Sequence, residues 1–584
     1  MVVDVAKLSV GREDYYVREV AQNREEYLTG HGESPGRWLG DGAAALGQQG
    51  TASTEAFVRM FHGRHPDTGA LLGRAHGEGG VPAFDVVFRP TKSVSLLYGL
   101  GDAQVASVVL EAHHQATEQA LGYLEEHVGA RRGHAGCEHV AGDGLLAVGF
   151  DHRTSRAGDP LLHTHVIVAN RVQGPDGRWT ALDGRDLYRH RLAADAIYRG
   201  AYQRALSRSL GVEWSEADQY GNREVTGIPD ELVRGFSKRA DAIDLEVERL
   251  EADGRVRTPK LVKWVVHSTR QAKRQEAPAT LAERWRAEAH EYGADVPGLL
   301  RDVLGRRGDA EPGPDTETNP AGTFDQLAGP QGLTAQASTF ARQDVIAALG
   351  AQLVGADRTR LETLADRFLE ERAVSVVAER SVEERRYATP ELLQVEQRLV
   401  AGSLGRRDEA AAVCSPTSVR MALTEHPTVG DDQAGMVRDL CGRGAGVGVV
   451  VGKAGTGKTF ALGVARHAFS LDGYRVMGTA PTGIATTSLD AEGFEEVATV
   501  DRLLVELDQA ARPSSQRTAR GGHAAPEPVL DARTVLVVDE AGMVGSRKLT
   551  RLLDHAHQAG AKIVLVGDDR QLAAIDAGGG FRGL

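Results

Sequence analysis

The chain has 584 residues, enough for about four domains of roughly 150 residues each. Hydrophobic residues make up 41% and charged residues 26%, values typical of folded globular proteins, so wholesale disorder is excluded. The net charge of −13 excludes a surface coated with basic residues, and any contact with nucleic acid must therefore come from a local basic cleft.

Three features bear on the cell compartment. The sequence has no run of about 18 apolar residues that could span a membrane, and its charged N-terminus lacks the apolar stretch of a signal peptide. Its three cysteines, Cys137, Cys414 and Cys441, are too few and too scattered for a disulfide framework. We expect a cytoplasmic protein with no membrane insertion.

The most informative part of the N-terminal region is a pair of expected strands at 145–150 and 161–172, joined by the turn residues RTSRAGDP into a β-hairpin. His163 and His165 are two residues apart and share one face, where an antiparallel partner can present His152 beside them. An isolated pair of this kind more often belongs to a surface or a core. The third histidine favours a divalent-metal site with positions open for substrate.

Other residues of this region are less specific. An expected helix over 102–128 carries His113, His114 and His127, which we expect to be solvated or packed and to which we assign no function. Basic residues near the hairpin are candidates for phosphate contacts, although a single one is more often a solvated charge. They are Arg89, Lys92, Arg153, Arg156, Arg270 and Lys273.

Composition changes after residue 304. Residues 305–335 are rich in Gly, Pro, Asp and Thr without an apolar period, which indicates a flexible linker. Apolar residues at three- and four-residue steps predict a small helical domain over 336–410. From 411 to 584 short apolar strands alternate with helices, the pattern of a parallel sheet with crossover helices. We therefore expect an α/β multidomain chain, with a first domain over 1–304.

A phosphate-binding loop, GKAGTGKT, occupies residues 452–459 directly after an apolar strand at 447–451. Gly452, Gly455 and Gly457 let backbone amides turn toward phosphates, Lys458 can reach the β and γ phosphates, and the Thr459 hydroxyl is placed for Mg²⁺. The loop predicts binding of ATP and Mg²⁺.

An acid pair, Asp539 and Glu540, follows the apolar strand 535–538. Such a pair can hold Mg²⁺ and activate water. A solvated loop is the alternative, but the phosphate-binding loop earlier in the chain favours the catalytic interpretation.

The C-terminal motifs resemble those of superfamily 1 helicases of the RecD-like branch. They are GKAGTGKT, TAPTGIAT at 479–486, DEAGMV at 539–544 and GDDRQL at 567–572. The resemblance implies that Gln433 contacts adenine, that residues 479–486 contact single-stranded DNA, and that Gln571 senses the γ phosphate. Because the chain ends at Leu584, directly after the last motif, we expect an incomplete helicase with only its first RecA-like motor domain. Such a chain should bind ATP weakly and unwind no DNA.

Three strings in the N-terminal region resemble the MobF (TraI/TrwC-like) family of conjugative relaxases, part of the HUH endonuclease group. HRTSRAGDPLLHTH at 152–165 is similar to its metal-binding motif, and FDVVFRPTKSVSLL at 84–97 is similar to its aspartate-bearing segment. DYY at 14–16 lies where the family has its nucleophilic tyrosine. The resemblance covers about residues 1–300 and implies an HUH-type antiparallel sheet with helices.

The resemblance also implies roles for single residues. Asp85 would orient a metal histidine and help to deprotonate the nucleophile. Family precedent favours Tyr15 over Tyr16 for the first attack, which spacing leaves open. Several relatives carry a second tyrosine pair, where this chain has Glu26 and Tyr27, so Tyr27 is a candidate for a later strand transfer or has no such role.

The implied reaction is transesterification that nicks single-stranded DNA at a conjugative transfer origin and leaves a 5′-phosphotyrosine link. We expect Mg²⁺ or Mn²⁺ at the histidines, and relaxosome accessory proteins and a coupling protein among the partners. One alternative is a rolling-circle replication initiator that uses the same chemistry. Another is a non-catalytic module that binds single-stranded DNA and has a structural metal site.

Overall fold

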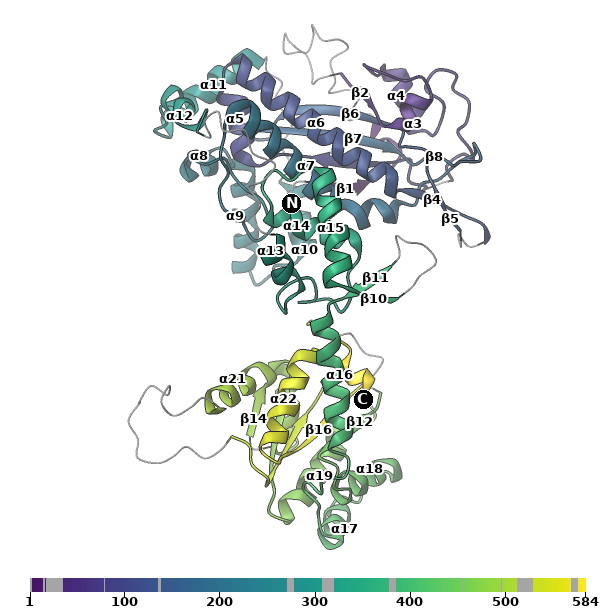
Figure 1. Ribbon diagram of the computed structural model, residues 1–584, viewed down its shortest axis with the longest axis vertical. Helices are drawn as coiled ribbons and strands as arrows, with labels where there is room; N and C mark the ends of the chain where they lie inside the picture. Colours follow the sequence, from purple (N-terminus) through teal and green to yellow (C-terminus); the bar gives the residue numbers. More distant parts are fainter. Residues whose placement is uncertain are drawn as a thin grey trace. The chain divides into compact units, whose positions relative to one another are not determined.

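A computed structural model of the chain describes residues 3–13, 16, 35–77, 79–134, 138–269, 278–306, 320–377, 385–453, 455–494, 496–511, 529–568 and 576–584. The chain divides into two compact units (Figure 1). The first comprises Met1–Thr323 and Arg342–Phe368, and the second comprises Phe324–Ala341 and Leu369–Leu584. No helix in the part of the chain that the structure describes is long and apolar enough to cross a membrane.

The first unit is built on a five-stranded sheet in the order β1-β3-β7-β6-β2, and every neighbouring pair is antiparallel. The strands are β1 (Val3–Lys7), β2 (Arg37–Leu39), β3 (Ala83–Phe88), β6 (Ala147–Thr154) and β7 (Pro160–Ala169). Two ribbons, β4 (Gly129–Arg132) with β5 (Glu138–Ala141) and β8 (Val172–Gln173) with β9 (Trp179–Thr180), stand apart from it. The antiparallel sheet with helices that we expected is confirmed.

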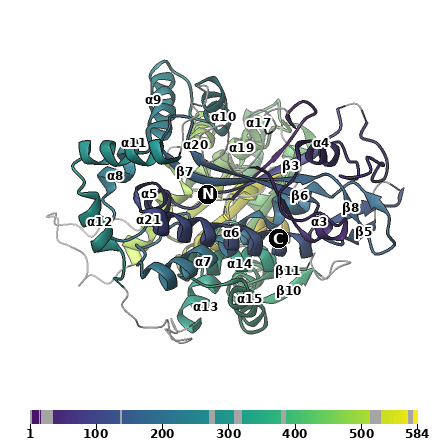
Figure 2. The same cartoon turned by 90° about the horizontal axis from the view of Figure 1, so that it is seen from above.

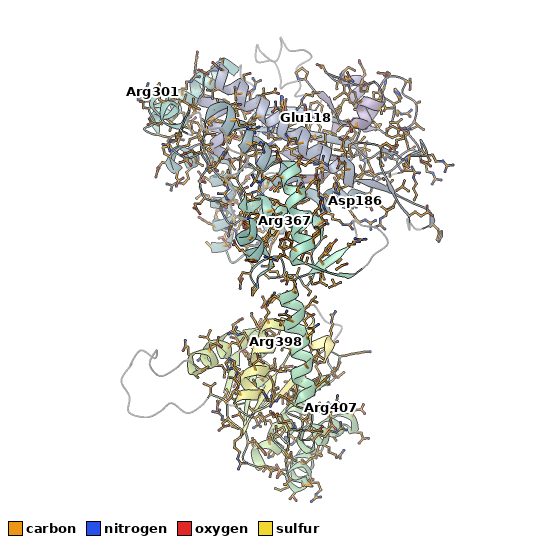
Figure 3. All side chains as sticks on the ribbon, in the orientation of Figure 1. Glu118, Asp186, Arg301, Arg367, Arg398 and Arg407 are labelled. Carbon is orange, nitrogen blue, oxygen red and sulfur yellow. The ribbon has the colours of Figure 1, made fainter. Side chains whose placement is uncertain are left out.

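Helices pack on this sheet and on one another. They are α3 (Asp41–Ala45), α4 (Thr54–Phe61), α5 (Lys92–Leu100), α6 (Ala103–His127), α7 (Gly184–Leu210), α8 (Asp230–Gly235), α9 (Lys238–Ala252), α10 (Pro259–Ser268), α11 (Pro278–Glu291), α12 (Val296–Val303), α14 (Arg342–Gln352) and α15 (Arg358–Arg372). The long helices α6 and α7 lie side by side across one face (Figure 2). Glu118, which is labelled in Figure 3, lies on α6. It pairs with Arg37 of β2 at 2.7 Å, which ties this helix to the sheet edge.

The opposite face of the sheet carries an aromatic cluster. Phe57, Met60 and Phe61 of α4 pack there against Phe150 of β6 and Ile167 of β7. Phe150 and Ile167 point to the same side because side chains alternate along each strand and residues paired across strands share a face. The face with the aromatic cluster is called the front face below, and the face under α6 the back face.

The region expected as one helical domain, residues 336–410, is divided between the two units. Helix α14 packs on α7 through small residues: a Cβ atom at Gly350 would lie 2.4 Å from the Cβ of Ala196, and one at Gly200 would lie 1.9 Å from the backbone oxygen of Ala356. Apolar periodicity predicts that a helix forms, but it does not predict which other helix it packs on. The sequence therefore could not assign α14 to the first unit. Residues 320–328 of the expected linker form helix α13 (Pro320–Ala328).

The second unit contains a parallel sheet in the order β12-β16-β15-β13-β14, which confirms the expected pattern. Its strands are β12 (Val447–Val451), β13 (Arg475–Ala480), β14 (Glu496–Thr499), β15 (Thr534–Val538) and β16 (Lys562–Gly567). Its other elements are the ribbon of β10 (Val374–Val377) and β11 (Arg386–Ala388) and the helices α16 (Pro390–Gly405), α17 (Pro416–Glu425), α18 (Asp431–Gly442), α19 (Lys458–Leu471), α20 (Gly483–Ala491), α21 (Val500–Ala511), η4 (Ala541–Met543), α22 (Ser546–Gln558) and α23 (Gly580–Gly583).

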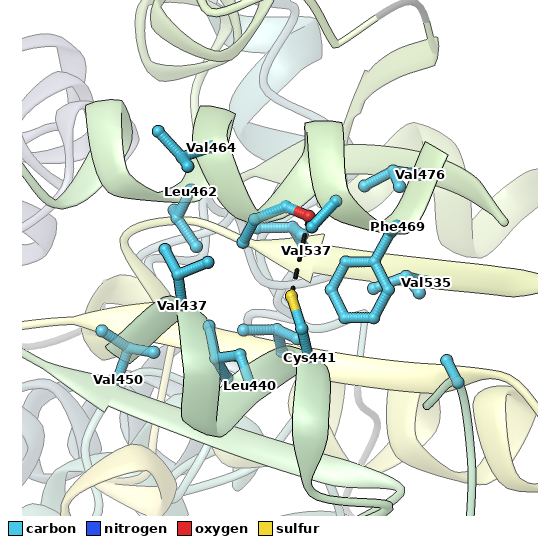
Figure 4. Packing of buried hydrophobic residues seen from close by; sticks show 14 of the residues in the cluster. Val437, Leu440, Cys441, Val450, Leu462, Val464, Phe469, Val476, Val535 and Val537 are labelled. Atoms are coloured by element: carbon cyan, nitrogen blue, oxygen red, sulfur yellow. Dashed lines mark hydrogen bonds between the residues drawn. The ribbon is translucent and has the colours of Figure 1, made fainter. Parts of the chain in front are cut away.

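Both faces of the parallel sheet are buried, because successive residues of its central strands enter different cores. Val535 and Val537 pack against α18 and α19 on one face (Figure 4), while Leu536 and Val538 pack against α21 and α22 on the other. Cys441 lies within the first of these cores, with its Sγ 3.8 Å from the backbone oxygen of Ala465. Residues 512–528, between α21 and β15, lie outside the described residues.

Candidate active sites

The three predicted histidines meet on the front face of the first sheet. His152 of β6 is paired directly with His163 of β7, and Phe150 is paired with His165. The three imidazole ring centres lie 5.1, 5.1 and 5.2 Å apart. Nitrogens about 2.1 Å from one tetrahedral ion hold their ring centres about 5 Å apart, so this spacing suits three ligands of one metal.

Hydrogen bonds fix the tautomers of two of these rings. Nδ1 of His163 lies 2.9 Å from the backbone oxygen of Leu161, and Nδ1 of His165 lies 2.9 Å from both carboxylate oxygens of Asp85. Because these oxygens accept, both Nδ1 atoms donate and each Nε2 keeps a lone pair for a metal. As they stand, no three His, Cys, Asp or Glu side chains among the described residues have their donor atoms arranged to hold a metal ion.

Asp85 links this cluster to a tyrosine. The hydroxyl of Tyr16 donates to Asp85 at 2.9 Å, the Tyr16 ring stacks on Phe150 at 5.4 Å, and its edge meets His165 at 5.7 Å. Tyr16 is buried against the aromatic cluster of the front face. The structure thus brings together Tyr16, Asp85 and the three histidines, whereas Tyr15 and Tyr27 lie outside the described residues.

A basic cleft with a volume of about 600 Å³ opens over this cluster, and Tyr16, Asp85, His163 and His165 line it. Its basic lining residues are Lys7, Arg12, Arg89, Arg156, Arg239 and Lys263. Two of these, Arg89 and Arg156, belong to the candidates from the sequence. The other four are Lys7 of β1, Arg12 after β1, Arg239 of α9 and Lys263 of α10. The first two are far from the last two in the sequence, so no local pattern could predict that all four line one cleft.

The other basic candidates from the sequence have different places. Lys92 donates from Nζ to the backbone oxygen of Pro160 at 2.7 Å, and burial lowers the pKa of its ammonium to about 8. Arg153 is buried. Arg270 and Lys273 lie outside the described residues.

The phosphate-binding loop follows β12 as predicted. Gly455 and Gly457 have φ angles of +80° and +72°, which glycine adopts without strain. Nζ of Lys458, the first residue of α19, donates to the backbone oxygen of Gly452 at 2.6 Å. Gln433 at the start of α18 donates from Nε2 to the backbone oxygen of Thr456 at 3.1 Å, so the residue implied in adenine contact lies beside the loop.

The acid pair lies at the same edge of the parallel sheet. Asp539 and Glu540 follow β15, and β16 separates β15 from β12, so the carboxyl ends of all three strands meet there. Burial raises the pKa of Asp539; burial and then the neighbouring Asp539 carboxylate raise the pKa of Glu540. The ammonium of Lys458 opposes both rises, which places the acids near the loop. Gln571 lies outside the described residues.

Comparisons with known proteins agree with this division. Residues 10–292 match the TrwC relaxase family, and residues 428–584 match an AAA domain. The multifunctional conjugation protein TraI of Escherichia coli is 31% identical over 326 residues, which are 53% of this chain and 18% of TraI. The conjugal transfer protein TraA of Rhizobium radiobacter is 35% identical over 200 residues, which are 34% of this chain and 16% of TraA.

Two further similarities concern single regions. The ATP-dependent RecD2 DNA helicase of Deinococcus radiodurans is 35% identical over 164 residues, which are 28% of this chain and 20% of that helicase. A structure of the conjugative relaxase TrwC in complex with oriT DNA, in a metal-bound form, aligns with 24% identity and a TM-score of 0.44 over 50% of this chain and 99% of that chain. The chain matches less than a fifth of the length of TraI and TraA. Residues 10–292 are thus similar to the TrwC relaxase family, and residues 428–584 are similar to an AAA domain.

Proposed function

We propose that the N-terminal domain nicks single-stranded DNA at a conjugative transfer origin by tyrosine transesterification. The observation that carries the proposal is Asp85, which accepts from the hydroxyl of Tyr16 and from Nδ1 of His165. One carboxylate thus joins a candidate nucleophile to a candidate metal ligand. The names of TraI and TraA, a conjugation protein and a conjugal transfer protein, support the biological setting.

His152, His163 and His165 suit a divalent cation, because their ring spacing fits one ion and because Nδ1 donates in two of the rings, which leaves the lone pair on Nε2. When bound, the cation supplies Lewis-acid polarisation of the scissile phosphate. Imidazole nitrogens also bind Zn²⁺, Ni²⁺ and Co²⁺ tightly in vitro, so metal affinity alone does not identify the ion used in the cell. We propose Mg²⁺ or Mn²⁺.

The protein's own residues carry the bond changes. A tyrosine hydroxyl has a reference pKa of about 10 and needs a base at neutral pH. The Asp85 carboxylate takes the phenolic proton, the phenolate oxygen bonds to phosphorus, and the bond from phosphorus to the 3′ oxygen breaks. The leaving 3′ oxygen takes up a proton, which gives a free 3′-OH and a 5′-phosphotyrosine. The number of phosphoester bonds is unchanged, so attack by a 3′-OH rejoins the strand without ATP.

The nucleophile comes from the pair Tyr15 and Tyr16. The hydroxyl of Tyr16 already lies at Asp85, while family precedent gives the first attack to Tyr15. Tyr27 is a candidate for a later strand transfer. The basic side chains of the cleft suit the backbone of a single strand, since the net charge of −13 leaves little attraction elsewhere on the surface.

The second unit suits ATP and Mg²⁺ at the loop of Gly452–Thr459. Lys458 and Thr459 would hold the phosphates and the cation, and Gln433 would contact the base. Asp539 and Glu540 have raised pKa values that a bound Mg²⁺ would lower, because the cation favours their ionised forms. This arrangement and the similarity to RecD2 support a helicase region that binds ATP. Accessory proteins and a coupling protein are further partners, and the setting is the cytoplasm.

The test is a search for a covalent adduct. Single-stranded oligonucleotides that tile the DNA beside the gene are incubated with the chain and Mn²⁺ or Mg²⁺, and denaturing gels reveal protein linked to DNA. We expect an adduct on one tile, lost with His163→Ala or with a chelator. DNA binding on every tile without an adduct would favour a non-catalytic binding module. An adduct on a replication origin instead of a transfer origin would favour a replication initiator.

A further inference from the structure

A chain of hydrogen bonds crosses the back face of the sheet, directly behind the histidine cluster. Thr164 lies between His163 and His165 on β7, and Asp151 lies beside His152 on β6. Because side chains alternate along a strand, Thr164 and Asp151 point away from the front face. They are paired directly across the two strands, and the Thr164 hydroxyl donates to Asp151 at 2.5 Å.

Helices α6 and α7 extend this chain. Nε2 of His113 on α6 lies 2.6 Å from the hydroxyl of Thr164, and its Nδ1 lies 2.7 Å from the hydroxyl of Tyr198 on α7. Nε2 of His114 lies 2.8 Å from the second oxygen of Asp151. His113, Thr164 and Tyr198 are at most 1% exposed, so water does not replace the two bonds of His113 to Thr164 and Tyr198.

The carboxylate at one end fixes the direction of every hydrogen bond. Asp151 only accepts, so the hydroxyl of Thr164 gives its hydrogen to Asp151 and can only accept from His113. His113 therefore carries its hydrogen on Nε2, and its bare Nδ1 accepts from Tyr198. Thr164 and His113 each use one donor and one acceptor, without a conflict.

The protonation states agree with this order. Burial lowers the pKa of His113 to about 3, so its ring is neutral and one nitrogen accepts. Burial raises the pKa of Tyr198 well above its usual value, so its hydroxyl keeps the hydrogen that it donates. Burial alone would raise the pKa of Asp151, but the hydrogen bond from His114 and nearby positive charges hold it below its usual value.

We propose that this back-face chain, Tyr198, His113, Thr164, Asp151 and His114, is a positioning network that sets the three front-face histidines for metal binding. Thr164 and Asp151 are fixed at neighbouring points of β7 and β6, so the strands that carry His152, His163 and His165 cannot slide or rotate independently. The inference rests on the proposed metal site. It assigns roles to His113, His114 and Tyr198, which touch neither metal nor DNA.

The test measures Co²⁺ binding to the metal-stripped full chain by visible absorption, which reports coordination geometry without DNA cleavage. The spectrum of the His163→Ala chain is subtracted, so that only binding at the triad remains. Thr164→Val removes the hydroxyl while keeping the branched shape, and Thr164→Ser restores it. Thr117→Val is the matched control, because Thr117 is also fully buried on the back face but donates only to the backbone oxygen of His113 in its own helix.

We expect Thr164→Val to lower Co²⁺ affinity about 10- to 100-fold and to change the absorption bands, as loss of a group that orients metal ligands does. Thr164→Ser and Thr117→Val should stay within about twofold of the native chain. The inference fails if Thr164→Val also stays within about twofold, or if Thr117→Val loses as much affinity.

Two further outcomes keep the test decisive. If Thr164→Val does not fold, as judged by circular dichroism, Tyr198→Phe replaces it, because it removes only the outer hydroxyl. A weaker Co²⁺ affinity in Tyr198→Phe supports the network, and an unchanged affinity overturns it. A native chain whose Co²⁺ spectrum equals that of His163→Ala overturns the proposed metal site itself, a failure distinct from that of the network.

Discussion

Asp85→Asn is the change that examines the front-face site most closely. Asparagine keeps the shape of the side chain but removes the charge and the second acceptor oxygen. The native carboxylate accepts from Tyr16 and from Nδ1 of His165, each at 2.9 Å. The substitution therefore affects both the removal of the phenolic proton and the orientation of one metal ligand.

The two effects have different magnitudes and can be separated. Loss of a general base slows a reaction about 10²- to 10⁴-fold, which corresponds to roughly 3 to 5 kcal/mol in the activation barrier. Loss of a carboxylate behind a metal-bound histidine lowers metal affinity about 10- to 100-fold. Saturating metal overcomes the second effect but not the first, so a drop of at least about 10²-fold should remain at any metal concentration.

The assay is single-turnover formation of the protein–DNA adduct on the cleaved oligonucleotide, as a function of Mn²⁺ concentration. Asp4→Asn is the control, because it is the same change on the neighbouring strand β1, where the Asp4 side chain is 73% exposed. We expect the native rate from Asp4→Asn. A rate for Asp85→Asn within about tenfold of the native one at saturating Mn²⁺ would refute the role of Asp85 as the base.

Three further predictions concern the tyrosines, the buried histidines and the nucleotide loop. Replacing Tyr15 and Tyr16 together by Phe should abolish the adduct in denaturing gels while DNA affinity is retained. An adduct in that variant would show that another residue is the nucleophile. The pKa values of His113 and His190 are lowered to about 3, mainly by burial. Only the unfolded chain takes up their protons between about pH 6.5 and 3, so acid should lower the free energy of unfolding, by roughly 2 kcal/mol for each histidine at pH 5. Denaturant titrations should show a shallower pH dependence for His190→Gln, and an identical slope would contradict this assignment. Lys458→Ala should weaken ATP binding at least about tenfold in equilibrium dialysis, since it removes a charged donor to the phosphates, and unchanged affinity would exclude the loop as the nucleotide site.

The clustering of the three histidines could be predicted from the sequence because it depends on local rules. His163 and His165 share a face by strand alternation, and a turn of Gly and Pro residues returns the chain so that His152 pairs with His163. The phosphate-binding loop is equally local, since Gly455, Gly457 and the strand before them lie within one segment. In each case the residues that form the site lie only a few positions apart in the sequence.

The parts that escaped prediction depend on contacts between distant segments. Arg239 and Lys263 reach the cleft from helices about 80 to 100 residues after the histidine hairpin, and their charges carry no local signal. His113 meets Thr164 only because α6 crosses the back face, so no local pattern could assign a role to His113. Helix α14 likewise belongs to the first unit through its small-residue contact with α7 at Gly350.

The central claim is that a tyrosine near the histidine cluster becomes linked to DNA. Its most direct test is to isolate the adduct, digest the protein and the DNA, and locate the bound nucleotide by tandem mass spectrometry. The proposed nicking reaction predicts a 5′-phosphonucleotide on Tyr15 or Tyr16, and no such modification in the His163→Ala chain. A nucleotide on any residue away from the cleft, or cleavage that leaves no covalent link, would contradict it.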